Sequence, residues 1–377
     1  MPSSALIPTH SHAADRVRRV GLCGNEFGPC LGPSYWDAEH RGEEALRIPL
    51  APRSQQGHAW LPRICCNGTM SGHESARRFA TALDQLGSSH PVVRVGCFAE
   101  MDRLVAEDPE YAQPVADVVT AYLRMPFDPP RFDRSYSRSL MLLPKVPDEP
   151  PMSQAPGFPE LQVRLAAQAV LTRRLLPEVA QQADQGDGGE AAVPDVFIDL
   201  TGATLVGIDF TGRRLHDDVI FSHAGFHEYV KFSSATFTGG AWFRNAAFHG
   251  TVSFNGTQFQ GIAMFECAKF IGWAGLPNFE RRWPVLSGDF GHAQFRGRAD
   301  FDSAEFRNHV IFDGAVVSNG SFLSSRFEDD ASFCRVTFGL SSFDGASFAR
   351  SPDFEGTSNL SGNVTVAGEP VRLRDDR

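Results

Sequence analysis

Long apolar runs, catalytic motifs and lysine are all scarce in this chain of 377 residues. No window approaches 18 consecutive apolar residues and no signal peptide opens the chain, so we expect a cytoplasmic protein with no membrane role. A glycine-rich phosphate loop, a nucleophile elbow and a paired-histidine helix motif are all missing, so we expect neither an enzyme nor a cofactor. Only three lysines accompany 32 arginines, which is typical of a GC-rich bacterial genome.

Cysteine is sparse as well, and five of the seven cysteines fall in the first 195 residues. Six residues separate the first pair and none separate the second, which is not a standard zinc-ligand pattern. We predict reduced, incidental thiols and no metal site. The alternative is a zinc site assembled from Cys23, Cys30, Cys65, Cys66, His40 and His58.

Phenylalanine, in contrast, is abundant, and 23 of its 31 residues share one register between Phe210 and Phe354. In residues 232–270 the steps alternate between five and six, so the true period is about eleven. A small or β-branched residue stands two positions before each of these phenylalanines, as Val230 does before Phe232. In an extended backbone both side chains then point to one side and the polar residues to the other.

Such a short repeat excludes a flat sheet, because five residues with one corner are too few for a strand and a hairpin return. The chain must instead turn the same way every five or six residues and climb. Four sides close a coil of roughly 20 to 22 residues, stacked about 4.8 Å from the next. We therefore predict an all-β solenoid with these residues in its interior ladders: Phe232, Phe237, Phe243, Phe248, Phe254, Phe259, Phe265, Phe270, Phe295, Phe301, Phe306 and Phe312.

This register resembles that of the pentapeptide-repeat family, whose members fold as right-handed quadrilateral β-helices. The first coil, IDLTGATLVGIDFTGRRL, shows the family's commoner leucine form at Leu200, Leu205 and Leu215. The resemblance covers residues 196–362. It implies seven to eight coils and a rod about 35 to 40 Å long.

One interruption breaks the register, between Phe270 and Phe290. Two prolines there predict a loop, since proline cannot donate to a β ladder. One interpretation makes this loop an interaction surface, because interfaces favour aromatic and arginine side chains. The other interpretation folds its aromatic residues back against the solenoid wall. The candidate loop residues are Trp273, Phe279, Arg281, Arg282 and Trp283.

Three helices are predicted between residues 74 and 126, from apolar residues at helical intervals. Asp108 is expected to cap the third helix and Pro109 to open it. Together they resemble a small HEAT-like unit. The segment is also similar to one that precedes the repeats in many actinobacterial pentapeptide-repeat proteins.

Composition divides the chain near residue 195, because 21 of the 25 prolines precede it. A helix from Glu160 to Val179 is expected near the first coil, since the open end of a β-helix needs a cap; alternatively it belongs to the helical unit. The predicted segments are a poorly ordered or irregular one at 1–70, the helical unit at 71–126, a proline-rich linker at 127–195, the β-helix at 196–362 and a tail at 363–377.

Two functions follow from the resemblance. A rod without a pocket can serve as a protein–protein interaction scaffold, with an unknown protein partner. Alternatively, like some members of the family, it imitates DNA and protects DNA gyrase or topoisomerase IV. Residues 196–363 hold about 18 acidic and about 13 basic side chains, a weak excess for a mimic of a duplex with two charges per base pair. We expect no direct binding of nucleic acid.

The C-terminal sequence bears on the oligomeric state. Topoisomerase-protecting relatives commonly dimerise through a C-terminal helix. Here SNLSGNVTVAGEPVRLRDDR contains glycine, proline and β-branched residues and has no helical period. Whether the chain dimerises is therefore left open.

Overall fold

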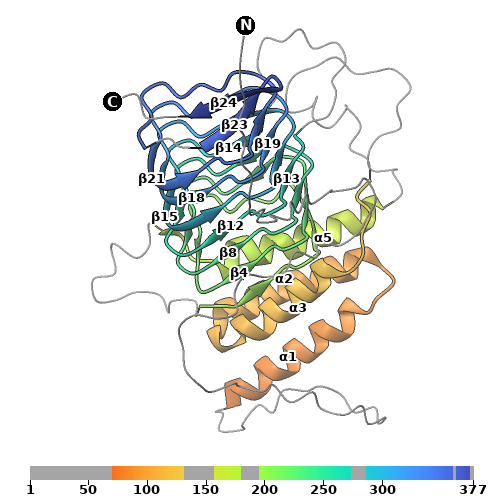
Figure 1. Cartoon of the computed structure of the whole chain (residues 1–377). Helices are drawn as coiled ribbons and strands as arrows, with labels where there is room; N and C mark the ends of the chain where they lie inside the picture. The colour runs from red at the N-terminus through yellow and green to blue at the C-terminus, as the bar shows by residue number, and fades with distance from the viewer. Residues whose placement is uncertain (1–69, 131–156, 180–194, 273–285, 360–361, 374–377) are drawn as a thin grey trace, which may run out of the picture. The chain divides into compact units, whose positions relative to one another are not determined.

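The computed structural model describes residues 70–130, 157–179, 195–272, 286–359 and 362–373 (Figure 1). Helices occupy the described part before residue 176. A β-solenoid of about seven turns follows, from Ile198 to Val366.

Three helical elements come first, because their apolar residues recur at helical spacing and form a common core. In the second helix the buried side chains are Phe98, Met101, Leu104 and Val105. The elements are α1 (Met70–Leu86), α2 (Pro91–Glu107) and α3 (Ala112–Arg124), with the 3₁₀ turn η1 (Pro109–Tyr111) before α3.

Asp108 does not cap the third helix as expected, since its side chain makes no capping hydrogen bond. The backbone of Asp108 makes hydrogen bonds instead. Its N–H donates to the Leu104 carbonyl at 2.8 Å, and its carbonyl accepts from the Tyr111 N–H at 3.1 Å. Pro109 opens the 3₁₀ turn η1, and α3 begins three residues later.

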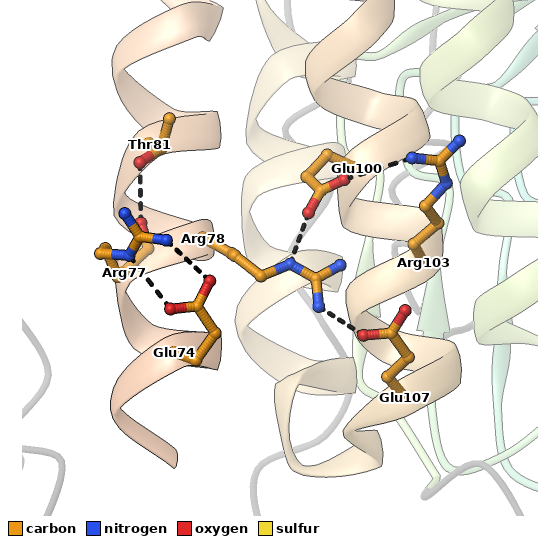
Figure 2. Close-up of polar contacts among 7 residues, drawn as sticks. All are labelled: Glu74, Arg77, Arg78, Thr81, Glu100, Arg103 and Glu107. Atoms are coloured by element: carbon orange, nitrogen blue, oxygen red, sulfur yellow. Dashed lines mark hydrogen bonds and ion pairs between the residues drawn. The ribbon is translucent and has the colours of Figure 1, made fainter. Parts of the chain in front are cut away.

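An arginine of α1 joins that helix to α2 (Figure 2). Arg78 donates from Nε to Glu100 at 2.6 Å and also pairs with Glu107. These two hydrogen bonds raise the pKa of Arg78. Beside them, Arg77 and Glu74 pair one turn apart on α1, at 2.8 Å. The Arg77–Glu74 pair is exposed and contributes little to stability, whereas the Arg78–Glu100 pair is partly buried between the two helices.

Helix α5 (Phe158–Val170) continues into one π-helical turn, η3 (Leu171–Leu175). The predicted helix therefore ends before Val179. Leu176 is extended, with φ −113° and ψ 116°. The cause is Pro177, which disfavours the helical conformation in the residue before it.

The solenoid has four walls, because parallel strands of successive coils pair in four columns (Figure 1). Wall 1 begins with β1 (Ile198–Asp199), β4 (Val219–Ile220), β8 (Ala241–Trp242) and β12 (Ala263–Met264). Wall 2 contains β2 (Thr204–Val206), β5 (Gly225–His227), β9 (Ala247–Phe248), β13 (Lys269–Phe270), β16 (Glu305–Phe306), β19 (Arg326–Phe327), β22 (Ser347–Phe348) and β23 (Gly362–Val366). Wall 3 contains β6 (Val230–Lys231), β10 (Val252–Ser253), β14 (Leu286–Asp289), β17 (His309–Ile311) and β20 (Ala331–Ser332).

Wall 4 starts as a separate column and joins wall 1 in the later coils. Its first strands are β3 (Arg214–Leu215), β7 (Thr236–Phe237) and β11 (Gln258–Phe259). Above them, single long strands cross the corner between walls 4 and 1: β15 (Gln294–Asp300), β18 (Val316–Ser321) and β21 (Thr337–Ser342). The four walls therefore form three sheets.

The inward phenylalanines stack in ladders that fill the interior. Rings of neighbouring coils lie nearly parallel, with centroids 4.4 Å apart for Phe322 and Phe343 and 5.1 Å apart for Phe333 and Phe354. Between ladders the rings mostly meet edge to face. The ladder that holds Phe295 and Phe338 has Val317 between them, so one rung lacks an aromatic ring.

Every second corner of the solenoid has the same turn, so the pattern repeats after two sides, or about eleven residues. At such a corner the Phe232 carbonyl accepts from the Ala235 N–H at 2.9 Å, and Ser234 has φ +56°. This is the geometry of a type II turn. At several of these corners the residue before the phenylalanine is Asp, whose carboxylate accepts a backbone N–H two residues on, as Asp289 does from Gly291 at 2.9 Å.

Two glutamines cover the lower edge of the first coil. Gln168 of α5, which is 4% exposed, accepts from the Val206 N–H at 2.9 Å and donates to its carbonyl at 2.8 Å. Gln113 of α3 makes the same pair of bonds with Phe197, at 2.8 and 3.3 Å. Each side-chain amide thus replaces a peptide group of an absent strand, so α5 lies against the first coil and covers part of its edge.

A further side of this edge is covered by the extended residues that follow η3. The Val179 N–H donates to the Gly212 carbonyl, and the Arg214 N–H donates to the Pro177 carbonyl, both at 2.8 Å. Glu178 pairs with Arg213 at 3.0 Å. The residues predicted as the end of a helix thus serve as an antiparallel edge segment.

The C-terminal end is a hairpin rather than a tail. Strand β23 adds in parallel to β22 of wall 2, and β24 (Glu369–Leu373) returns antiparallel to β23. The two-residue turn consists of Ala367 and Gly368, both with positive φ, as hairpins require. The β structure therefore extends past the predicted boundary at 362, because Val364 becomes part of the core at 3% exposure.

Candidate interaction surface

The predicted interaction loop lies outside the described residues, and so do the zinc candidates. The structure does show where the loop leaves the solenoid: after Gly272 and before Leu286, at the corner of walls 2 and 3. The ladder step from Phe254 to Phe290 spans 36 residues instead of the 22 from Phe232 to Phe254, so 14 residues are inserted. The undescribed candidates are Trp273, Phe279, Arg281, Arg282 and Trp283 in the loop, and Cys23, Cys30, Cys65, Cys66, His40 and His58.

The interior cannot take part in recognition. The phenylalanines predicted for the ladders are all at most 1% exposed and contact one another. Binding or chemistry must therefore come from the outward positions of the four walls.

Wall 1 carries apolar side chains on its outer surface, where the sequence pattern suggests polar ones. Ile220, Trp242 and Met264 occupy equivalent positions in three successive coils, paired in register through β4, β8 and β12. Ile262 lies at the edge of the same surface. All four side chains are partly exposed. We call these four residues the apolar stripe.

The Trp242 ring passes close to Gly240, and a glycine there leaves room for it. A Cβ atom at Gly240 would be 2.6 Å from the indole Nε1 of Trp242, so any other residue there would displace the ring. The backbone of Gly240 is fixed by a hydrogen bond from its N–H to Asp218 Oδ1, at 2.7 Å. The sequence therefore positions a large aromatic surface on the outside of the solenoid.

Exposed apolar residues continue along wall 1 above and below the stripe. Phe197 is 48% exposed at the first coil, Leu323 is 39% exposed and Leu340 is 80% exposed in the upper coils. We call the outward residues of wall 1, from Phe197 to Asp344, the wall-1 face. Reading the register outward from Ala241-Trp242-Phe243 would have found this face, because Trp242 occupies the outward slot between two inward residues.

Some of the acidic side chains around the solenoid are paired with arginine or lysine. Arg244 pairs with Glu266 at the edge of wall 1. Arg298 pairs with Asp300 at 2.7 Å. On wall 2, Arg307 pairs with Glu305 at 3.4 Å. At these positions acidic and basic side chains are therefore interspersed along the surface.

One hollow brings a thiol and an imidazole together, so it is a candidate for chemistry. His292, Asp313, Cys334 and Arg335 line a space of about 200 Å³ near the corner of walls 3 and 4. Cys334 Sγ donates to Asp353 Oδ2 at 3.0 Å, and this bond together with burial raises the pKa of the thiol. A thiol held protonated is a poor nucleophile, so the hollow gives no sign of thiol catalysis.

A second titratable group lies on wall 2. The rings of His227 and His249 stack with centroids 4.5 Å apart. Burial and the neighbouring imidazole lower the pKa of His227 to about 4, and burial raises the pKa of Glu228 to about 7. Across the described ranges, no three His, Cys, Asp or Glu residues are grouped so that they could hold a metal ion. In the same ranges no helix is long and apolar enough to span a bilayer.

The fold and its surface define a β-solenoid with a closed aromatic core and an apolar stripe on one wall. Comparison with protein families gives the class: residues 232–278 match the description "Pentapeptide repeats (9 copies)". The solenoid is therefore a pentapeptide-repeat solenoid, as the phenylalanine register predicted. No relative was found among the curated proteins.

Proposed function

We propose that this chain is a non-enzymatic protein-interaction scaffold that binds its partner through the wall-1 face. The observation that carries the proposal is the apolar stripe around Trp242. Tryptophan is enriched at the energetic centres of interfaces, and a row of apolar side chains on a rigid wall loses little entropy on binding. The charged pairs beside it, Arg244–Glu266 and Arg298–Asp300, supply a polar rim.

Affinity capture tests the proposal with a matched pair of surface variants. The wild-type chain and the double variant Trp242→Ser/Met264→Ser are used to capture proteins from an extract of the organism that encodes it. A specific partner should be lost with the double variant and kept with Ile311→Ser, which removes an outward apolar residue from wall 3 instead. Equal recovery with all three proteins would contradict the proposal.

The predicted loop provides a second arm of the same experiment. Replacing Trp273, Arg281, Arg282 and Trp283 by serine or alanine should leave the captured partner unchanged if wall 1 is the contact face. Loss of the partner only with this loop variant would transfer the function from wall 1 to the loop.

Topoisomerase protection is the competing function, and the weak excess of acidic over basic side chains in the solenoid counts against it. A duplex mimic needs a strong and continuous negative potential. In a gyrase supercoiling assay inhibited by a fluoroquinolone, micromolar protein should therefore fail to restore activity. Restored activity would favour the DNA-mimic function over the scaffold.

A further inference from the structure

The wall-1 face has two edges that carry different side chains. A two-fold axis can place one edge of the face against the other edge of a second copy. Residues that precede each wall-1 strand form the leading edge, and residues that follow it form the trailing edge. The apolar stripe lies mainly between them. The leading edge contains Asp218, Gly240, Ile262, Arg298, Asn319 and Leu340, and the trailing edge contains Ser222, Arg244, Glu266, Asp302, Leu323 and Asp344.

A two-fold axis parallel to the solenoid axis would bring these edges together. Facing strands of the two copies then run in opposite directions at the same coil level, so each leading edge lies opposite a trailing edge. The central column faces itself, which places Trp242 against its own copy. Asp300 also faces its own copy, where each carboxylate keeps its ion pair with Arg298, at 2.7 Å.

Three contacts between the edges are complementary in this arrangement. Arg298 comes opposite Asp302 of the same coil. Asp218 comes next to Arg244, one coil apart, which pairs opposite charges. Leu340, 80% exposed, comes next to Leu323, 39% exposed, also one coil apart. Each contact occurs twice because of the two-fold axis.

Asp302 in particular lacks a cation of its own. Its carboxylate accepts from Ser321 Oγ at 2.5 Å and from the Leu323 N–H at 2.9 Å, while the nearby Arg298 makes its ion pair with Asp300. Among the described residues none forms an ion pair with Asp302. Burial, and to a lesser extent Asp300, raises the pKa of Asp302, so a facing guanidinium would stabilise the ionised carboxylate.

We propose that the partner at the wall-1 face is a second copy of this chain, docked about this two-fold axis. The inference rests on the proposed function, because it assigns a partner to the same face. About seven coils spaced by ~4.8 Å, each presenting roughly four residues of ~3.3 Å, give a face of about 450 Å² per copy. A standard interface buries about 800 Å² per partner, so the dimer is weak, with a Kd on the order of 10–100 μM.

Sedimentation velocity of the full chain over about 1 to 300 μM measures this equilibrium. The wild type should change from monomer to dimer. Trp242→Ser and Arg298→Glu should each weaken the dimer about tenfold or more. Two matched control variants should leave the dimer unchanged. They are Ile311→Ser on wall 3 and Arg326→Glu, the same charge reversal on wall 2. Circular dichroism confirms that each variant is folded.

The outcomes separate this inference from the proposed function. A wild type that stays monomeric throughout, or a dimer unaffected by Trp242→Ser, overturns the inference. If Trp242→Ser weakens the dimer and Arg298→Glu does not, the two-fold arrangement is wrong. If the chain is monomeric but loses a captured partner with Trp242→Ser/Met264→Ser, the scaffold function stands and self-association does not.

Discussion

At the scale of the residue, inward phenylalanines contact other phenylalanines both within a ladder and between ladders. Phe254 stacks between Phe232 and Phe290, with centroids 4.8 and 4.9 Å away, and meets Phe243 and Phe265 edge to face at 5.6 and 5.5 Å. Both geometries suit the quadrupole of an aromatic ring. The ladder therefore contributes specific ring contacts in addition to buried apolar area.

Phe254→Ala should lower the free energy of unfolding by about 3 to 5 kcal/mol, because neighbouring rings cannot collapse into the space that it leaves. Urea denaturation measures the change. Val316→Ala, at a position 42% exposed on wall 4, should change stability by less than about 0.5 kcal/mol. A neutral Phe254→Ala would mean that the inward register is misassigned.

Glu228 makes stability depend on pH. Burial raises its pKa from 4.5 to about 7 in the folded protein, so folding favours the protonated carboxyl. This contribution is complete below about pH 4.5 and is lost as the pH rises through 7. Glu228→Gln, which stays neutral, should therefore gain stability relative to the wild type between pH 5 and pH 8.

Urea denaturation at both pH values detects this difference. The exposed Glu328→Gln serves as the control and should show the same small difference at both. A Glu228→Gln variant whose difference from the wild type is independent of pH would show that Glu228 is not desolvated in the folded protein.

At the scale of the element, corners and caps decide whether the coils can stack. One corner column contains Gly239, Gly261 and Gly297, where the chain passes close to the coil below. A Cβ atom at Gly261 would be 2.3 Å from the Gly239 carbonyl oxygen, which is backbone and cannot move aside. Glycine is therefore required there by close approach.

Gly261→Ala should destabilise the solenoid by about 1 to 3 kcal/mol through this overlap. Gly96→Ala in α2 has the opposite expected sign, since a Cβ at Gly96 meets nothing within 4 Å and alanine favours a helix by about 0.8 to 1.0 kcal/mol. Thermal unfolding of both variants is the test. A stabilised Gly261→Ala would contradict the stacking at this corner.

The glutamine caps give a second prediction at this scale. Gln168→Leu leaves the buried N–H and carbonyl of Val206 without partners and should cost about 1 to 3 kcal/mol. Gln113→Leu should cost less, because water can reach Phe197, which is 48% exposed. Equal losses in urea denaturation would show that burial does not distinguish the two caps.

The phenylalanine ladders could be predicted from the sequence because every inward slot has the same requirement, and a repeated requirement produces a period. The caps could not, since Gln113 and Gln168 each act once and carry no periodic signal. The C-terminal hairpin has a local signal, since Val364, Thr365 and Val366 precede an Ala-Gly turn, and the absence of a helical period does not exclude a strand there. The apolar stripe differs from the caps, because Ile220, Trp242 and Met264 recur every 22 residues and the register locates these outward positions. The core does not constrain outward positions, so the inward phenylalanine pattern does not predict which residue types occupy them.

At the scale of the whole molecule, the four walls share one phenylalanine interior but differ in their outward side chains. Wall 4 presents uncharged polar residues such as Gln258 and Gln294, and wall 2 presents charged pairs such as Arg307–Glu305. Wall 1 presents the apolar stripe and its charged edges. Because the core sets the positions of all walls, a contact face can vary in sequence without a change of fold.

Hydroxyl-radical footprinting of the full chain, with and without bound partner or at low and high protein concentration, tests the contact face most directly. Tryptophan and methionine react readily, so Trp242 and Met264 report on wall 1, and Val316 reports on wall 4. Binding should lower the oxidation of Trp242 and Met264 several-fold and leave Val316 unchanged. Unchanged oxidation of Trp242 and Met264 in a bound sample would contradict the assignment of wall 1 as the contact face.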